Sequence, residues 1–219
     1  MVAEIICKMV LTYIILCKLF IVLTGTQLMA QENITGVYNL SGVMETASGF
    51  KLNKDSTFEF YFSYGALDRY GSGTWKIRNG QVSFRSKPWP GKDFKLVKSS
   101  NIPGNDNAAV IAAKNSMLLP YVYFTFYSNG KSIEKKADTK GYVGFPVQKI
   151  DSIMLQFEFT PERKTVFRKL KPGHNNFEFV FEPWLVEVFF INFKLSYEEG
   201  SLKGGHPLLS QKVYSYTKE

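Results

Sequence analysis

Cysteine is almost absent from this chain, and the two cysteines present lie close to its start. Cys7 and Cys17 are the only ones among 219 residues, so the sequence after residue 17 can form no internal disulfide. A eukaryotic secreted protein of this size more often uses disulfides. If the protein is exported, as argued below, this absence favours a bacterial periplasm or cell surface.

Histidine is equally scarce, with only His174 and His206 in the chain. Each falls in a turn-forming sequence, and neither stands at ligand spacing from a second His, Cys or acidic residue. We therefore expect two solvent-exposed turn histidines. A Gly-x-Ser-x-Gly elbow, a nucleotide-binding glycine loop and a cysteine nucleophile are also missing. The sequence predicts no metal, no cofactor and no catalytic residue, and we expect the protein not to be an enzyme.

Long hydrophobic runs are confined to one segment at the start. Met9–Thr26 is almost unbroken apolar sequence, and Ala30 supplies a small residue where a signal peptidase would cut. We predict that residues 1–30 are a signal peptide. The alternative is a retained membrane anchor, because about 18 apolar residues can just span a bilayer. Lys18 would cost about 3 kcal/mol there. The protein is predicted to be exported, as a periplasmic, cell-surface or secreted protein.

Acidic residues are outnumbered by basic ones, 19 to 27. Without Lys8, Lys18 and Glu4 of the leader, 25 basic and 18 acidic residues leave a net charge of +7. The charges are scattered, and the densest groups are Lys135–Lys136 and residues 163–171. We expect solvated faces; the alternative is weak attraction to an anionic surface such as lipopolysaccharide or lipid headgroups. Nucleic acid is not expected as a partner, because no basic groove is evident.

Amphipathic helices are missing too, and strand-like alternation takes their place. Phe58, Phe60, Phe62 and Tyr64 share one face of a predicted strand. Similar alternation recurs at residues 153–159 and 177–182, and residues 188–193 form a denser apolar run that favours a strand covered on both sides. The chain after the leader is predicted to be all-β.

Two Asn-Gly pairs predict β-hairpins, because both residues tolerate the positive φ of a two-residue turn. Around Asn79–Gly80, counting outward places Arg78 opposite Gln81, Ile77 opposite Val82 and Trp75 opposite Phe84. All four apolar residues then share a face. Around Asn129–Gly130 the same count places Phe126 opposite Ile133.

A turn-rich segment at residues 101–107 predicts a domain boundary. We expect a β-domain over residues 31–100, a linker at 101–107, and a β-sandwich over residues 108–219. Phe193–Lys203 indicates a hairpin and Lys212–Thr217 a closing strand. These last strands have an alternative place: they could return to complete the first sheet, which would make the sandwich an insertion.

The first region resembles the small bacterial lipocalin-like domains. The resemblance covers about residues 34–97 and is carried by these motifs: Ile34–Tyr38, Gly49–Leu52, Thr57–Phe60 and Gly71–Ile77. Ser56 stands where the preceding turn usually has glycine. The phrase Tyr64–Tyr70 is similar to one in a group of exported bacterial proteins of unknown function. This resemblance implies a small antiparallel sheet or partial barrel.

The second region resembles the transthyretin-like, carboxypeptidase-regulatory type of Ig-like sandwich. Its motifs are a first strand at Ala108–Ala113, a second ending at Asn129–Lys131, and the turn and aromatic strand of Ala137–Phe145. The family usually has Thr-Asp in that turn, whereas this chain has Asp138–Thr139. The resemblance implies an adhesive or spacer module without chemistry of its own.

Six residues are candidates for the rim of a ligand or partner site. Asp68 and Arg69 form a polar pair framed by Tyr64 and Tyr70, in what we expect to be a loop at one end of a sheet. The plainer interpretation is a connecting loop with a local ion pair. Trp89 and Trp184 lie in proline-containing loops, where a ring can close the end of a core or meet a ligand or partner.

Two functions remain open. The first is a non-catalytic envelope protein that binds or supports an unknown protein or surface polymer. The alternative is a lipocalin-like carrier of a small apolar ligand, which needs a closed barrel with an unfilled interior. The bulky phenylalanines at the inward positions argue against such a space.

Overall fold

The computed structural model describes residues 34–65, 67–103, 107–146, 149–210 and 213–219. The predicted leader, residues 1–30, lies outside these ranges. Strands dominate the described residues, and η1 (Ser116–Tyr121) is a short 3-10 helix. No helix in the described ranges is long and apolar enough to cross a membrane. The predicted fold class is confirmed: the described residues are nearly all-β, with an antiparallel barrel and a β-sandwich.

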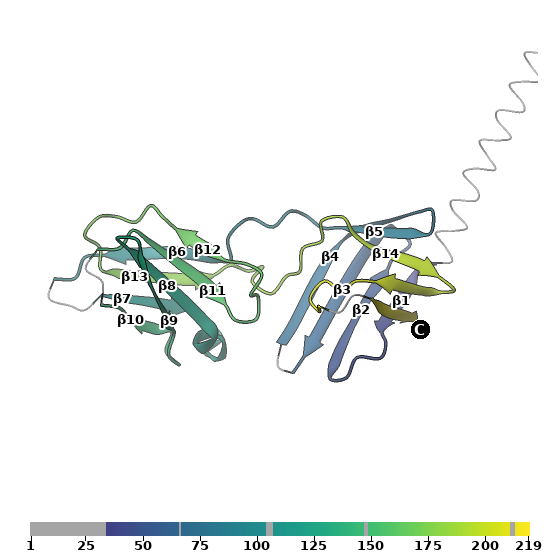
Figure 1. The fold of residues 1–219 in the computed structure, drawn as a ribbon, viewed down its shortest axis with the longest axis horizontal. Coiled ribbons are helices and arrows are strands. Elements are labelled where there is room, and N and C mark those ends of the chain that lie inside the picture. The colour runs from purple at the N-terminus through teal and green to yellow at the C-terminus, as the bar shows by residue number, and fades with distance from the viewer. Residues whose placement is uncertain (1–33, 66, 104–106, 147–148, 211–212) are drawn as a thin grey trace, which may run out of the picture. The chain divides into compact units, whose positions relative to one another are not determined.

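The chain forms two compact units, and one is inserted into the other (Figure 1). The first unit comprises residues up to Lys87 together with Val188–Glu219, and the second comprises Pro88–Glu187. The sandwich therefore interrupts the sequence of the barrel.

The first unit is a closed barrel of eight strands. They are β1 (Gly36–Leu40), β2 (Thr46–Leu52), β3 (Thr57–Tyr64), β4 (Leu67–Arg78), β5 (Gln81–Arg85), β14 (Phe193–Glu198), β15 (Ser201–Gly204) and β16 (Tyr214–Lys218). Each strand pairs antiparallel with the next in this order, and β16 pairs with β1. The last three strands thus complete the sheet that the first five begin.

The second unit is a sandwich of two four-stranded sheets. One has the order β10 (Tyr142–Gly144), β7 (Ala108–Ala112), β13 (Asn176–Phe181) and β6 (Phe94–Ser100); the other has β12 (Thr165–Phe167), β11 (Ser152–Phe157), β8 (Val122–Ser128) and β9 (Lys131–Lys136). Strands β7 and β13 run parallel, and the other neighbours are antiparallel. Phenylalanines of β8, β11 and β13 fill the core between the sheets.

Both predicted Asn-Gly hairpins are confirmed, including their registers. Arg78 pairs with Gln81 and Trp75 with Phe84 in the barrel, while Phe126 pairs with Ile133 in the sandwich. The turn residues have positive φ at both positions, 51° and 71° for Asn79 and Gly80. Such turns match the right-handed twist of the paired strands.

The division between the units lies at Lys87 and Val188, not at residues 101–107 as predicted. Residues 94–100 were assigned to the first region, but they form β6, which pairs with β13 of the sandwich. A local turn signal cannot reveal a partner strand that lies about 80 residues further along the chain. Strands β14, β15 and β16, which fall in the region assigned to the sandwich, lie in the barrel.

Aromatic rings fill the barrel, and one of them comes from the segment that returns from the sandwich. The Phe190 ring lies 5.1 Å from that of Phe58 and 5.3 Å from that of Phe60, centroid to centroid. Gly71 makes room for it, since a Cβ there would lie 2.7 Å from the Phe190 ring. The predicted covered strand at 188–193 is instead an irregular segment, which buries Val188 and Phe190 but leaves Ile191 and Asn192 exposed, and only Phe193 begins a strand.

Candidate functional site

Four of the six predicted site residues lie on the β3–β4 hairpin, but they do not form a loop. Tyr64 pairs with Leu67 at the hairpin tip, and Asp68, Arg69 and Tyr70 belong to β4. The placement of these residues in a connecting loop was therefore wrong. Gly71 of the same strand makes room for the Phe190 ring.

Asp68 and Arg69 point to opposite faces of β4, because successive side chains of a strand alternate. Asp68 is exposed and accepts a hydrogen bond of 2.6 Å from the Ser63 hydroxyl. Arg69 is only 4 % exposed and lies on the inner face, opposite Phe62. The two residues do not line one rim. Tyr64 and Tyr70 of the same hairpin are 53 % and 51 % exposed.

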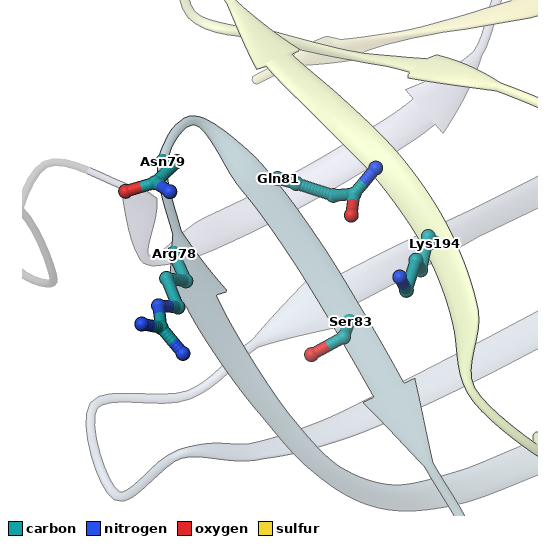
Figure 2. A pocket seen from close by; sticks show the side chains of 5 residues that line it. All are labelled: Arg78, Asn79, Gln81, Ser83 and Lys194. Carbon is teal, nitrogen blue, oxygen red and sulfur yellow. The ribbon is translucent and has the colours of Figure 1, made fainter.

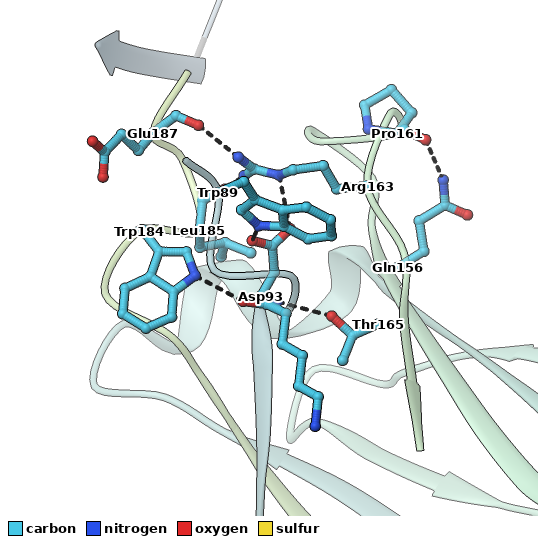
Figure 3. Close-up of polar contacts among 10 residues, drawn as sticks. Trp89, Asp93, Gln156, Pro161, Arg163, Thr165, Trp184, Leu185 and Glu187 are labelled. Carbon is cyan, nitrogen blue, oxygen red and sulfur yellow. Dashed lines mark hydrogen bonds and ion pairs between the residues drawn. The ribbon is translucent and has the colours of Figure 1, made fainter. Parts of the chain in front are cut away.

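Trp89 and Trp184 belong to the other unit, where they flank a buried ion pair (Figure 3). The Arg163 Nε lies 2.8 Å from an Asp93 carboxylate oxygen. The Trp89 indole N–H donates to the other Asp93 oxygen at 3.0 Å, and the Trp184 indole donates to the Lys92 carbonyl at 2.7 Å. Both rings thus have the polar partners that a partly buried tryptophan needs.

This ion pair ties together the two ends of the sandwich unit. Besides Asp93 near the start, Arg163 reaches the carbonyls of Leu185 and Glu187 at the end. Asp93 and Arg163 are 1 % and 7 % exposed. Burial raises the pKa of Asp93, and the Arg163 guanidinium and Trp89 indole oppose that rise. A carboxylate and a guanidinium buried in this way have a structural role. We call Asp93 and Arg163, with the two tryptophans beside them, the clasp.

His206 is buried at 7 % exposure and His174 is half-buried, so the prediction of two solvent-exposed histidines was wrong. Its Nδ1 accepts hydrogen bonds from the backbone N–H groups of Leu208 and Leu209, at 2.9 and 3.1 Å. The ring proton therefore lies on Nε2, which donates to the Ser48 hydroxyl at 3.0 Å. Burial lowers the pKa of His206 to about 4. The ring lies among the buried rings of Phe60, Phe62 and Tyr216, at centroid distances of 5.9, 5.5 and 6.2 Å.

A basic surface that the sequence analysis did not single out lies on the outer face of β4, β5 and β14 (Figure 2). It carries a shallow depression of about 390 Å³, lined by Arg78, Asn79, Gln81, Ser83 and Lys194. Cross-strand pairing places Lys76, Ser83 and Lys194 in one row. Lys76, Arg78, Arg85 and Lys194 are all exposed. We call this surface the basic face.

Comparison with known proteins identifies no relative. No protein-family model matches the chain, and no curated protein matches it. Among solved structures, a Helicobacter pylori β clamp bound to a DNA ligase peptide aligns at 8 % identity and a TM-score of 0.12, over 89 % of this chain and 63 % of that one. A superposition this poor carries no argument about fold or function.

The described residues hold no group of three or more His, Cys, Asp or Glu side chains placed to bind a metal. The basic face could have been found in part from the sequence. Lys76, Arg78 and Arg85 alternate on the polar side of the hairpin around Asn79–Gly80, whose register was predicted. Only the pairing of β5 with β14, across the inserted sandwich, adds Lys194.

Proposed function

We propose that the protein is a non-catalytic, exported envelope protein, periplasmic or at the bacterial cell surface, whose two β-units bind or support a partner. In this proposal the barrel is of the lipocalin-like type and the inserted sandwich of the transthyretin-like type. The partner is a protein or a cell-surface polymer, met by the outer surfaces of the units.

The observation that carries the proposal is the filling of the barrel by its own chain. Phe50, Phe58, Phe60, Phe84 and Phe190 are each at most 2 % exposed. The Phe50 ring lies 4.7 Å from that of Phe84 and 5.9 Å from that of Phe190. A carrier needs interior space for its ligand, and rings in direct contact leave little of it. The outer surfaces are then the places where binding can occur.

Native mass spectrometry tests this proposal on the protein recovered, without denaturant, from the envelope of its own host. A bare mass, or a complex with another macromolecule, is the expected result. A discrete small-molecule excess that disappears on denaturation would support the carrier instead. The same measurement checks the leader, because a mass that includes residues 1–30 would show that it is retained as an anchor.

Turnover assays with ester, glycoside and peptide substrates test the non-catalytic part of the proposal. We expect no specific turnover by the purified protein. Reproducible turnover that follows the protein through two independent purification steps would contradict the proposal, whatever the mass measurement shows.

A further inference from the structure

The basic face gathers four exposed cations around a depression on the outside of the barrel. Its four cations come from three neighbouring strands, and no acidic residue projects outward among them in Thr74–Arg78, β5 or Phe193–Ser196. Within the described part of the chain, none of the four forms an ion pair. Their charge is thus available to a partner.

Some lysines elsewhere on the surface lie beside acids, whereas the four cations of the basic face do not. Lys51 lies 3.1 Å from Glu59, Lys136 lies 2.6 Å from Glu158, and Lys203 lies 3.2 Å from Glu198. The pair of Lys203 and Glu198 borders the basic face at the end of β14 and neutralises the nearest outward acid on that strand.

The depression within the basic face suits one phosphate oxyanion. Arg78 offers a planar fork of N–H donors, and Lys194 offers an ammonium group across the strands. Gln81 and Ser83 lie between them and supply an amide and a hydroxyl (Figure 2). Arginine recognises phosphate oxygens through two parallel hydrogen bonds, which a monovalent chloride cannot accept in the same way.

The basic face extends well beyond what one ion could contact. Lys76 and Lys194 flank Ser83 on either side, which separates their Cα atoms by about 10 Å at the usual strand spacing. Arg85 lies four residues from Gln81 along β5, or about 13 Å. Cations spread over such an area match a surface that presents many phosphates side by side, as a membrane of anionic lipids does.

We propose that the basic face docks on an anionic lipid surface and that one headgroup phosphate enters the depression between Arg78 and Lys194. This inference rests on the proposed function, because a lipid surface is within reach of an exported envelope protein. It names the partner that the proposed function leaves open. Attraction of this kind weakens as salt is raised, since the charges lie in solvent.

Vesicle co-sedimentation tests the inference with the protein as its host exports it. Vesicles of pure phosphatidylcholine are compared with vesicles in which about a third of the lipid is phosphatidylglycerol. We expect binding to the anionic vesicles only. The double variant Arg78→Gln/Lys194→Gln should weaken that binding roughly 10–30-fold, because each basic residue near an anionic surface strengthens binding several-fold.

The matched control is Lys98→Gln/Lys131→Gln, which removes the same charge from exposed strand positions of the other unit. We expect this control to weaken binding less than threefold. Equal losses in the two double variants would overturn the inference, because net charge alone would then explain the binding. Wild-type protein that does not distinguish the two kinds of vesicle would also overturn it. Unchanged thermal unfolding checks that both variants fold.

Inorganic phosphate distinguishes a lipid from a soluble ligand. Phosphate at 10 mM should reduce vesicle binding no more than sodium chloride of equal ionic strength. If phosphate alone released the protein, the depression would be a site for a soluble ion and the lipid inference would fail. Such failures leave the proposed function standing, because native mass spectrometry detects partners on any surface. Catalytic turnover, conversely, would end the proposed function while vesicle binding could still be measured.

Discussion

In the barrel, the segment that returns from the inserted unit is held by aromatic rings, whereas in the sandwich the two chain ends are held by a buried ion pair. Phe190 packs against several phenylalanines inside the barrel, at centroid distances from 5.1 Å upward. Arg163 instead joins Asp93 to the carbonyls of Leu185 and Glu187. The barrel thus holds its returning segment by apolar contacts, and the sandwich holds its two ends by charge.

This difference in chemistry determines how the stability of each unit should respond to substitutions. Apolar contacts are small individually, so a ring can be lost while its neighbours keep most of their contacts. A buried charge depends on its partner, and removing one member leaves the other desolvated and uncompensated. Substitutions of single rings in the barrel should therefore each remove part of its stability. In the sandwich, the loss should be greatest for substitutions of Asp93 or Arg163.

The largest effect is expected from Arg163→Ala. It leaves the Asp93 carboxylate buried and removes the donor to two carbonyls, so we expect the sandwich to lose about 4 kcal/mol of unfolding free energy. Urea unfolding measures the loss, and hydrogen exchange read by mass spectrometry shows in which unit it occurs.

Arg168→Ala is the control for that experiment, because Arg168 is an exposed arginine of the same unit. It should cost less than about 0.5 kcal/mol. The double variant Asp93→Asn/Arg163→Met, which removes both charges, should recover part of the stability lost in Arg163→Ala. A double variant no more stable than the single one would show that the carbonyl bonds, not the charge pair, hold the clasp.

The next largest effect is expected from Phe190→Ala, at about 3 kcal/mol, since truncating a buried phenylalanine removes contacts and leaves a cavity. Urea unfolding gives the free energy, and an apolar fluorescent probe tests for the cavity. We expect the probe to bind the variant and not the wild type. Ile191→Ala is the neighbouring control, because Ile191 is 77 % exposed; it should be nearly neutral. Probe binding by the wild type would argue for the carrier.

A smaller effect concerns pH and separates the barrel from the sandwich. Burial lowers the pKa of His206 to about 4 from 6.5, so the unfolded chain takes up the proton first as pH falls. Stability from this residue is complete above pH 6.5 and is lost between pH 6.5 and 4. The barrel should lose at most about 3 kcal/mol over that window.

His206→Gln should remove that loss, while His174→Gln should keep it. His174 is less buried, and its ring shares a hydrogen bond of 2.9 Å with the Ser99 hydroxyl. Carboxylates add a slope common to all three proteins, so the quantity to compare is the difference from wild type. The same acid sensitivity in wild type and His206→Gln would assign the effect to the carboxylates.

Local signals in the sequence were sufficient for the hairpins but not for the closure of the barrel. Asn79–Gly80 and Asn129–Gly130 define turn and register together, so every cross-strand pair followed by counting. The strand β6 and the boundary at Lys87 depend on pairing with β13, about 80 residues away. No pattern within Phe94–Ser100 distinguishes one sheet from the other.

The predictions for Asp68, Arg69 and His206 were wrong for a related reason. The loop expected around Asp68 and Arg69 is part of a strand, and the missing side chain of Gly71 in that strand makes room for the Phe190 ring, which comes from more than a hundred residues later. His206 lies in a sequence typical of an exposed turn, and only the folded loop shows that Ser48 and two backbone N–H groups surround it. Such contacts join residues that are distant in the chain, so composition and spacing do not reveal them.

The smallest predicted effect is one in which the two units should not differ. Gly80 and Gly130 close equivalent Asn-Gly turns, with φ of 71° and 74°. A Cβ at Gly130 would meet nothing within 4 Å, and one at Gly80 would meet only the Tyr197 carbonyl oxygen, at 3.9 Å. Gly80→Ala and Gly130→Ala should therefore each cost about 1 kcal/mol, the price of left-handed backbone for a residue with a side chain. Urea unfolding of the two variants measures both values. If the two costs differ by more than about 1 kcal/mol, the stability of each turn depends on the core of its own unit. The difference between the two units would then extend beyond Phe190 and the Asp93–Arg163 pair.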